Sequence, residues 1–408
     1  MARTHYQVLI IGGGNAGLSV AAHLLRRNSL LEIGIIEPSE YHYYQPAWTL
    51  VGGGAYDINK TVQPEAKYIP KGTDWIKDYA EEILPDSNTV ATRSGKRYTY
   101  DYLVVCPGIQ LDWHKIEGAE QWLGKRGITS NYTFKTAPYT YECIASFTGK
   151  GKALFTAPNT PIKCGGAPQK IMYLAADNFR RRGLLGSDTV HFYSGGGVIF
   201  GVQKYAEALK KVCERYHIGL HFLHNCVAVD GERKVAYFEA KKGDTTERIA
   251  VEFEMIHLTP PQSAPDFIKR SPLAVPNDPL GWMEVDKHTL QHPRYPNVFG
   301  IGDVTNTPNA KTGAAIRKQN PVLVENLLYC IEHKTTTLPA PKQYNGYGSC
   351  PLVTGYGKLI LAEFDYNNNP QESFPFDQSK ERFSMWLLKK EILPRLYWHA
   401  ILKGKMQG

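Results

Sequence analysis

The sequence predicts an α/β fold with two Rossmann-like domains and a C-terminal region of different composition. Three observations support this prediction. Strand-like and helix-like segments alternate along the chain. Residues 5–37 read as strand, glycine turn, helix and strand. A second alternating series begins near Lys152 and ends near Pro293. The length of 408 residues fits two or three domains. We expect residues 1–151 to begin the first domain, 152–293 to form the second, 294–335 to return to the first, and 336–408 to form the C-terminal region.

Composition excludes several classes of protein. Hydrophobic residues make up 42% and charged residues 21%, which excludes a disordered chain. No apolar run approaches the roughly 18 residues of a spanning helix, and the N-terminal residues run straight into a strand, so we expect no leader peptide here. The seven cysteines are widely spaced without a Cys-x-x-Cys, which argues against a disulfide scaffold and a zinc site.

The positive charge is concentrated at the C-terminus. The net charge is +8, and residues 380–408 contribute 7 − 2 = +5 of it. A nucleic-acid-binding protein usually spreads its basic residues over a larger face. We therefore expect a local docking patch at the C-terminus and no nucleic-acid partner.

The N-terminal strand and turn predict a dinucleotide site. Residues 5–11 read as a buried strand, and the glycines that follow are spaced as G-x-G-x-x-G. Such glycines permit a tight turn, close approach of a pyrophosphate and close helix–strand packing. An acid follows the last glycine by 20 residues, at a strand end suited to ribose hydroxyls. The expected contacts are Gly12, Gly14, Asn15, Ala16, Gly17 and Glu37.

A late Gly-Asp pair indicates which dinucleotide binds. Gly302 and Asp303 end a strand-like run, where the carboxylate can reach the ribityl chain of a flavin. An ordinary helix N-cap is the alternative interpretation of Asp303. Together with the N-terminal glycines, the pair resembles the FAD-containing disulfide-reductase-like superfamily.

A second nucleotide motif for NAD(P)H is degenerate. The run Ser194–Gly201 has its last glycine one position late, and Ile199 and Phe200 fill the space of a pyrophosphate. The other candidate turn, Ala157–Pro161, has no glycine. We therefore expect electrons to enter from a donor other than NADH.

Two cysteines are candidates for redox chemistry. Cys164 lies between Lys163 and Lys170 in a loop that leads into a helix, and both cations and helix N–H groups lower a thiol pKa. Cys350 lies in a segment punctuated by glycine and proline, which we expect to be irregular. Incidental buried thiols remain the alternative for both. The other five cysteines are interpreted as packing residues.

These features resemble the sulfide:quinone oxidoreductases, in the branch that includes the mitochondrial enzymes. The resemblance covers nearly the whole chain and is strongest in residues 43–51, the Cys164 segment, and residues 295–303, 349–356 and 361–366. Two places depart from the family pattern: the strand end usually read Ala-Thr-Gly is Cys106-Pro107-Gly108, and the third-glycine region is Asn15-Ala16-Gly17. The third redox cysteine of some bacterial relatives has no counterpart.

The resemblance implies a mechanism and site residues. Hydrosulfide attacks Cys350 of a Cys164–Cys350 redox pair, bridged directly or through extra sulfur. This leaves a Cys350 persulfide and a Cys164 thiolate that donates electrons to FAD. Ubiquinone or another membrane quinone then reoxidises FAD, and glutathione, sulfite or sulfide accepts the sulfane sulfur. Further FAD contacts implied are Gln45, the Ala80 backbone, and Lys311 near the N1/O2 edge, with a solvated lysine as the alternative for Lys311.

A quinone partner requires access to a membrane, and the C-terminus offers it. Apolar and aromatic residues recur at helical spacing over residues 383–402, with lysine and arginine between them. Such segments lie in the lipid interface, although a core-packing amphipathic helix has the same period. Pro394 is expected to break the segment into two short helices. We expect a peripheral, monotopic protein of a bacterial or mitochondrial inner membrane, and self-association into a homo-oligomer stays open.

Three other functions compete with this interpretation. A type II NADH:quinone dehydrogenase needs a working second nucleotide motif and no cysteine pair, which is the reverse of this sequence. A sulfide-oxidising subunit that passes electrons to a cytochrome normally carries a leader. A flavin-binding sensor without turnover needs neither cysteine.

Overall fold

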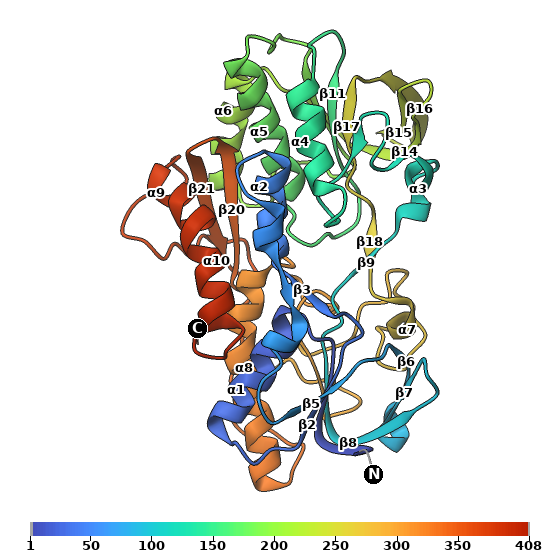
Figure 1. The fold of residues 1–408 in the computed structure, drawn as a ribbon, viewed down its shortest axis with the longest axis vertical. Helices are drawn as coiled ribbons and strands as arrows, with labels where there is room; N and C mark the ends of the chain where they lie inside the picture. Colours follow the sequence, from blue (N-terminus) through green and yellow to red (C-terminus); the bar gives the residue numbers. More distant parts are fainter. Residues whose placement is uncertain (1–2, 407–408) are drawn as a thin grey trace.

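The computed structural model describes residues 3–406 and shows two α/β units joined by a pair of short strands (Figure 1). The connecting strands are β9 (Gln110–Leu111) and β18 (Gln262–Ser263), which pair antiparallel between the units. The C-terminal elements run along one side of both units (Figure 1). This arrangement confirms the predicted fold class of two Rossmann-like units followed by a distinct C-terminal region.

The first unit contains a seven-stranded sheet with β1 and β8 at its centre. Its strands are β1 (His5–Ile11), β2 (Ile33–Ile36), β5 (Thr73–Ile76), β6 (Ala80–Leu84), β7 (Thr89–Thr92), β8 (Arg97–Val105) and β19 (Val298–Gly300). Their order is β5-β2-β1-β8-β7-β6, and β19 pairs with β8. Helices α1 (Asn15–Arg27) and α8 (Gly313–His333) pack on each other and share a core with the apolar strands.

The second unit repeats the central strand order of the first. Its parallel sheet has the order β10-β17-β11-β12-β13, so that β13-β12-β11-β17 corresponds to β5-β2-β1-β8. The strands are β10 (Ile128–Thr129), β11 (Ala153–Ala157), β12 (Val190–Ser194), β13 (Gly219–Phe222) and β17 (Met255–His257). The unit also contains α4 (Ala137–Ser146), α5 (Ala167–Arg181), α6 (Gln203–Arg215), and the antiparallel strands β14 (His224–Asp230), β15 (Val235–Lys242) and β16 (Thr245–Glu252).

The chain passes between the units earlier than we expected. It leaves the first sheet at β9, and β10 already pairs with β17 in the second sheet. It returns through β18, well before residue 293. The domain boundaries that we expected at 151/152 and 293/294 therefore lie later in the sequence than the two places where the chain passes between the units. The reason is that β9, β10 and β18 are two residues long, too short for any periodicity to mark them.

The C-terminal region begins with a hairpin, so the expectation of an irregular segment around Cys350 is wrong. Cys350 lies within β20 (Gly348–Gly355), which pairs antiparallel with β21 (Lys358–Phe364). Pro351 interrupted the predicted strand pattern. Proline has no backbone N–H to donate. It is accommodated here because the sheet has only two strands, so β20 has an edge on which no neighbouring strand requires a donor.

The last helical run among the described residues is continuous and is here called the C-terminal helix (residues 383–401). It comprises α9 (Phe383–Leu387), a π-helical segment Leu388–Ile392, α10 (Leu393–Leu396) and a second π-helical segment Tyr397–Ile401. The predicted break at Pro394 is therefore wrong. Pro394 lies in the first turn of α10, directly after the wider π turn, where its missing N–H leaves the run intact.

The remaining helices and strands are short. They are β3 (Tyr41–Tyr43), β4 (Val62–Pro64), α2 (Trp48–Gly52), α3 (Ala119–Trp122) and α7 (Asp266–Lys269), with 3-10 turns at Gln45–Ala47, Ile58–Thr61, Glu65–Lys67, Pro85–Ser87 and Trp113–Lys115. Among residues 3–406, no helix combines the length and apolar character needed to cross a membrane.

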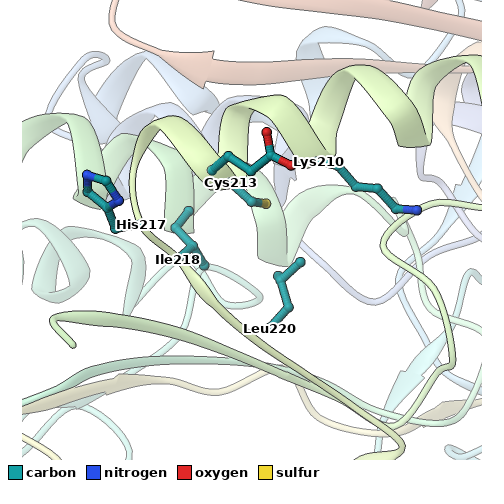
Figure 2. A pocket seen from close by; sticks show the side chains of 6 residues that line it. Lys210, Cys213, His217, Ile218 and Leu220 are labelled. Carbon is teal, nitrogen blue, oxygen red and sulfur yellow. The ribbon is translucent and has the colours of Figure 1, made fainter. Parts of the chain in front are cut away.

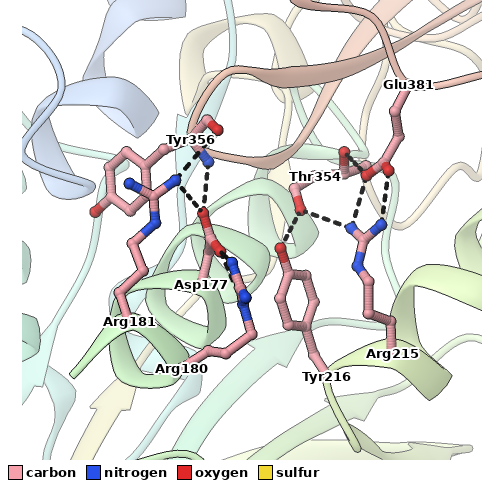
Figure 3. A network of polar contacts seen from close by, with 8 residues as sticks. All are labelled: Asp177, Arg180, Arg181, Arg215, Tyr216, Thr354, Tyr356 and Glu381. Carbon is pink, nitrogen blue, oxygen red and sulfur yellow. Dashed lines mark hydrogen bonds and ion pairs between the residues drawn. The ribbon is translucent and has the colours of Figure 1, made fainter. Parts of the chain in front are cut away.

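A polar network that includes the buried Asp177 anchors the hairpin to the second unit (Figure 3). Asp177 of α5 accepts the Tyr356 backbone N–H at 2.9 Å and pairs with Arg180 and Arg181 at 2.8 and 3.1 Å. Arg215 of α6 pairs with Glu381, which lies just before the C-terminal helix, at 2.6 Å. The network therefore fixes the strand that carries Cys350 against the two helices of the second unit.

Candidate functional site

The glycine turn after β1 has the shape that a dinucleotide requires. Gly12 has φ +104°, and a Cβ there would lie 2.5 Å from the Cys106 carbonyl oxygen. A Cβ on Gly17 would meet the Gly12 carbonyl, which explains the close helix–strand approach. A Cβ on Gly14 would meet nothing within 4 Å, so this side of the turn is open.

The predicted acids lie at the carboxyl ends of the strands of the first sheet. The Glu37 carboxylate follows β2 and accepts from the Gly13 and Ser39 N–H groups, both at 2.7 Å, and burial raises its pKa. Asp303 follows β19, and burial raises its pKa while the cations Lys311 and Lys163 oppose the rise. Both acids therefore lie where ligands bind in open α/β sheets.

These residues fit FAD. The open side of Gly14 leaves room beside the N-terminus of α1, and the side-chain oxygen of Asn15 is buried without a hydrogen-bond partner. Gly13 and Glu37, which are hydrogen-bonded to each other, belong to the same turn region. The Glu37 N–H donates to the carbonyl of Ile76, the last residue of β5, at 3.0 Å. Ala80 begins the next strand, β6. Together they offer helix N–H groups for phosphate and acceptors for ribose hydroxyls.

The two predicted redox cysteines come together from distant segments. Cys164 lies in the turn between β11 and α5, with a left-handed backbone at φ +53°. Its N–H donates to the Lys311 carbonyl at 2.8 Å, which ties this turn to the Asp303 loop. Cys350 is buried in β20, and its thiol hydrogen-bonds to the Cys164 sulfur. The structure therefore brings the two cysteines together as free thiols, and their role as a redox pair stays a prediction from the sequence resemblance.

The electrostatics give the two sulfurs different roles. The hydrogen bond from Cys350 holds the pKa of Cys164 well below its usual range, and Lys170 adds to this effect although burial opposes it. The Lys170 Nζ atom lies 3.1 Å from the Cys164 Sγ atom. The same sulfur–sulfur hydrogen bond, together with burial, raises the pKa of Cys350 well above its usual range. Cys164 is therefore the thiolate of the pair.

Lys389 is a residue of this site that sequence reasoning assigned elsewhere. We expected it among the basic residues of the membrane patch, but it is 5% exposed and its ammonium donates to the Pro46 carbonyl at 3.0 Å. Burial and then the nearby Lys170 lower its pKa to about 8, and the two cysteine sulfurs oppose this shift. The C-terminal helix therefore delivers a second buried cation to the cysteines.

Gln45, Lys163 and Lys311 make hydrogen bonds that the sequence did not specify. The Lys163 ammonium donates to the Gln45 side-chain oxygen at 2.8 Å, away from the thiol, and burial lowers its pKa to about 8. The Lys311 ammonium donates to the carbonyls of Asp303 and Thr305 at 2.8 and 2.7 Å. Lys311 is thus buried and holds the Asp303 turn, so it is not a solvated lysine.

In the second unit, the turn where a second dinucleotide would bind lacks the G-x-G-x-x-G spacing, although Gly165 and Gly166 lie in it just before α5. Because β11 corresponds to β1, its following turn is the pyrophosphate position, and that turn carries Cys164. The run Ser194–Gly201 follows β12 instead, which corresponds to β2. The turn of the second unit therefore presents Cys164 at the place where the first unit presents its glycine motif.

A surface pocket on the second unit is separate from this site. Figure 2 shows Lys210, Cys213, Glu214, His217, Ile218 and Leu220 lining it at the end of α6. Burial raises the pKa of Cys213 to about 11, so its thiol stays protonated at neutral pH. This agrees with the interpretation of Cys213 as a packing residue.

The fold, the glycine turn and the cysteine pair define a flavoprotein of the disulfide oxidoreductase class. Residues 6–140 match the family described as pyridine nucleotide-disulphide oxidoreductase. The mouse protein "Sulfide:quinone oxidoreductase, mitochondrial" is 46% identical over 100% of this chain and 88% of its own length. The protein of the same name from Dictyostelium discoideum is 45% identical over 98% and 87%. The chain therefore belongs to the sulfide:quinone oxidoreductase family, and its cofactor is FAD.

A solved structure supports the fold independently. The sulfide:quinone oxidoreductase of Aquifex aeolicus superposes with a TM-score of 0.82 over 99% of this chain and 92% of that one, at 21% identity. The competing class is distant. A type II NADH:quinone oxidoreductase from Staphylococcus aureus is 29% identical over only 29% of this chain and 30% of its own length.

Proposed function

We propose that this chain oxidises hydrosulfide at the Cys164–Cys350 pair and passes two electrons through FAD to a membrane quinone. The observation that supports this best is the contact between the two thiols, one from the β11–α5 turn and one from β20, beside the buried ammonium of Lys170. A thiol with a lowered pKa next to one with a raised pKa is the arrangement that thiol–disulfide exchange needs.

The sulfur steps balance as follows. Hydrosulfide attacks the Cys350 sulfur of the oxidised pair. An S–S bond forms to Cys350, the Cys350–Cys164 bond breaks, and Cys164 leaves as a thiolate with the electron pair. A sulfane acceptor then attacks the outer sulfur of the Cys350 persulfide and releases the Cys350 thiolate. The two thiolates close again to a disulfide as two electrons leave for FAD.

The residues of the chain prepare these steps. Cys164 is the better leaving group because its pKa is the lowered one of the pair, and Lys170 holds the thiolate by a charge-assisted hydrogen bond at 3.1 Å. Lys389 brings a second positive charge toward the incoming anion. When bound, FAD supplies the two-electron acceptor that links the sulfur couple to quinone.

The finer partners belong to the same proposal. We assign the sulfane sulfur to a small acceptor such as glutathione, sulfite or sulfide, and the electrons to ubiquinone or another membrane quinone. The exposed face of the C-terminal helix would dock the protein peripherally on the mitochondrial or bacterial inner membrane.

The test is anaerobic flavin absorbance in the FAD-loaded protein. Sulfide is expected to bleach the flavin and a short-chain quinone to restore it, whereas NADH is expected to leave it oxidised. Cys350→Ser should abolish bleaching by sulfide because the attacked sulfur is gone. Cys213→Ser, a buried cysteine of α6, is the matched control and should bleach at the normal rate. Full-speed bleaching in Cys350→Ser, or bleaching by NADH, would refute the proposal.

A further inference from the structure

A buried chain of polar groups links the first unit to the C-terminal helix. The Glu65 Oε2 atom lies 3.0 Å from the His42 Nδ1 atom, and the His42 Nε2 atom lies 2.6 Å from the Tyr397 hydroxyl. The three residues are 1%, 3% and 6% exposed. They come from the turn Glu65–Lys67, strand β3 and the C-terminal helix, so the chain joins segments far apart in sequence.

The second carboxylate oxygen of Glu65 has no partner. Its Oε1 atom is buried and accepts no hydrogen bond. A Cβ built on Gly13 would lie 2.8 Å from this oxygen and also against the side chain of Glu37. The free oxygen therefore lies at the dinucleotide turn, beside the acid expected to bind ribose. A buried carboxylate oxygen without a donor is strongly disfavoured, so this position calls for a donor from the ligand.

In dinucleotide-binding folds, the acid at the end of the second strand binds the ribose of the adenosine half, so Glu65, which lies beside Glu37 at Gly13, would face that half of FAD. Ribose hydroxyls and the adenine amino group are hydrogen-bond donors, as an unpaired carboxylate oxygen requires. We propose that Glu65 is a second acceptor for the adenosine half of FAD, and that His42 and Tyr397 are positioning residues that hold its carboxylate in place. Flavin binding and the seating of the C-terminal helix then stabilise each other.

Packing around the chain supports the coupling. The Tyr397 ring lies 4.7 Å from that of Tyr44, and the Trp398 ring lies 4.9 Å from that of Tyr68. All four rings are buried in the same core as the strands and helix of the glycine turn. A ligand that fixes the position of the Glu65 side chain also fixes His42 and Tyr397 through the hydrogen bonds between them. By thermodynamic linkage, a well-packed C-terminal helix strengthens flavin binding as much as flavin binding stabilises the helix. The inference rests on the FAD assignment and is independent of the sulfide chemistry.

The experiment measures the rate of flavin release from the FAD-loaded, full-length protein after dilution, followed by the rise in flavin fluorescence. Glu65→Gln keeps the side-chain shape but removes the charge, and release is expected to be roughly tenfold faster, as loss of one charge-assisted hydrogen bond predicts. Tyr397→Phe removes one hydroxyl from the other end of the chain and should also accelerate release, by a smaller factor.

Tyr100→Phe is the matched control, because Tyr100 is buried in the same unit and its hydroxyl has no hydrogen-bond partner. It should release flavin at the normal rate. The Glu65→Gln/Tyr397→Phe double variant should accelerate release by less than the product of the two single effects, since both act through one chain. A normal rate in Glu65→Gln, or a full product in the double variant, would overturn the inference. Should Glu65→Gln not fold, a normal rate in Tyr397→Phe would overturn it.

Discussion

At the scale of single residues, we expect the charge state of Cys164 to govern the reactivity of the proposed site. Its pKa is lowered first by the hydrogen bond from Cys350 and then by Lys170, so its thiolate persists to lower pH than that of a free cysteine. Lys170→Met removes the cation 3.1 Å away and should raise the pKa of Cys164. We expect the pH midpoint for iodoacetamide modification of Cys164 in the reduced protein to rise, as measured by mass spectrometry.

Lys170→Arg is the control for this prediction because it retains the positive charge, and its midpoint should stay close to the normal one. An unchanged midpoint in Lys170→Met would show that Lys170 does not stabilise the thiolate.

The sequence allowed Lys170 to be predicted near Cys164, because both residues flank the start of one helix. Lys389 could not be placed in this way. A lysine on an amphipathic helix has the same spacing whether it faces lipid headgroups or a buried thiolate. Only packing of the C-terminal helix against the turn at Pro46 decides between them.

At the scale of elements, the hairpin that carries Cys350 depends on its anchor to α5. Asp177 is buried and accepts from the Tyr356 backbone as well as from Arg180 and Arg181. Asp177→Asn removes the negative charge. It also replaces one carboxylate oxygen, which accepts hydrogen bonds, by an amide NH2 group, which donates them and therefore faces other donors. We expect the free energy of unfolding to fall by about 2–3 kcal/mol, measured by chemical denaturation.

An exposed carboxylate provides the comparison. Glu247 pairs with Lys242 at the surface, where both side chains are more than half exposed. Glu247→Gln should leave unfolding unchanged within error. Equal effects of the two substitutions would show that the Asp177 network does not anchor the hairpin.

The elements that the sequence predicted well are those with strong local patterns. The strand, glycine turn, helix and acid of residues 5–37 were predicted because each position has a local steric reason. The strand holding Cys350 was missed because Pro351 and its neighbouring glycines resemble loop signals, and a two-stranded hairpin tolerates them. The pairing of β10 with β17 is a long-range contact of two residues and leaves no local trace.

At the scale of the whole molecule, the C-terminal helix has two faces. Met385, Trp386, Tyr397 and Trp398 are buried, which supports the core-packing alternative for that face. Phe383, Leu387 and Ile392 are instead 62%, 41% and 47% exposed. Exposed apolar side chains grouped on one segment mark an interaction surface, and this group is the part of the predicted membrane patch that the core leaves available.

Replacing Phe383, Leu387 and Ile392 together by glutamine should release the protein from anionic phospholipid vesicles in a sedimentation assay, because it removes apolar area without touching the core. The matched control replaces Leu30, Val198 and Leu223, which are also exposed but lie on other elements, and it should still sediment. Normal sedimentation of the first triple variant would exclude this face as the docking surface.

The left-handed backbone at Cys164 has a consequence for how this chain evolves. A residue with a side chain is strained at φ +53° by about 1 kcal/mol, whereas glycine is not. Selection for stability alone would therefore favour glycine at this turn, the residue that dinucleotide-binding turns of the fold normally use. A lineage that no longer met sulfide would gain stability by losing this cysteine. The sulfur chemistry proposed for Cys164 would account for a side chain at this position, since the stability of the fold alone favours glycine there.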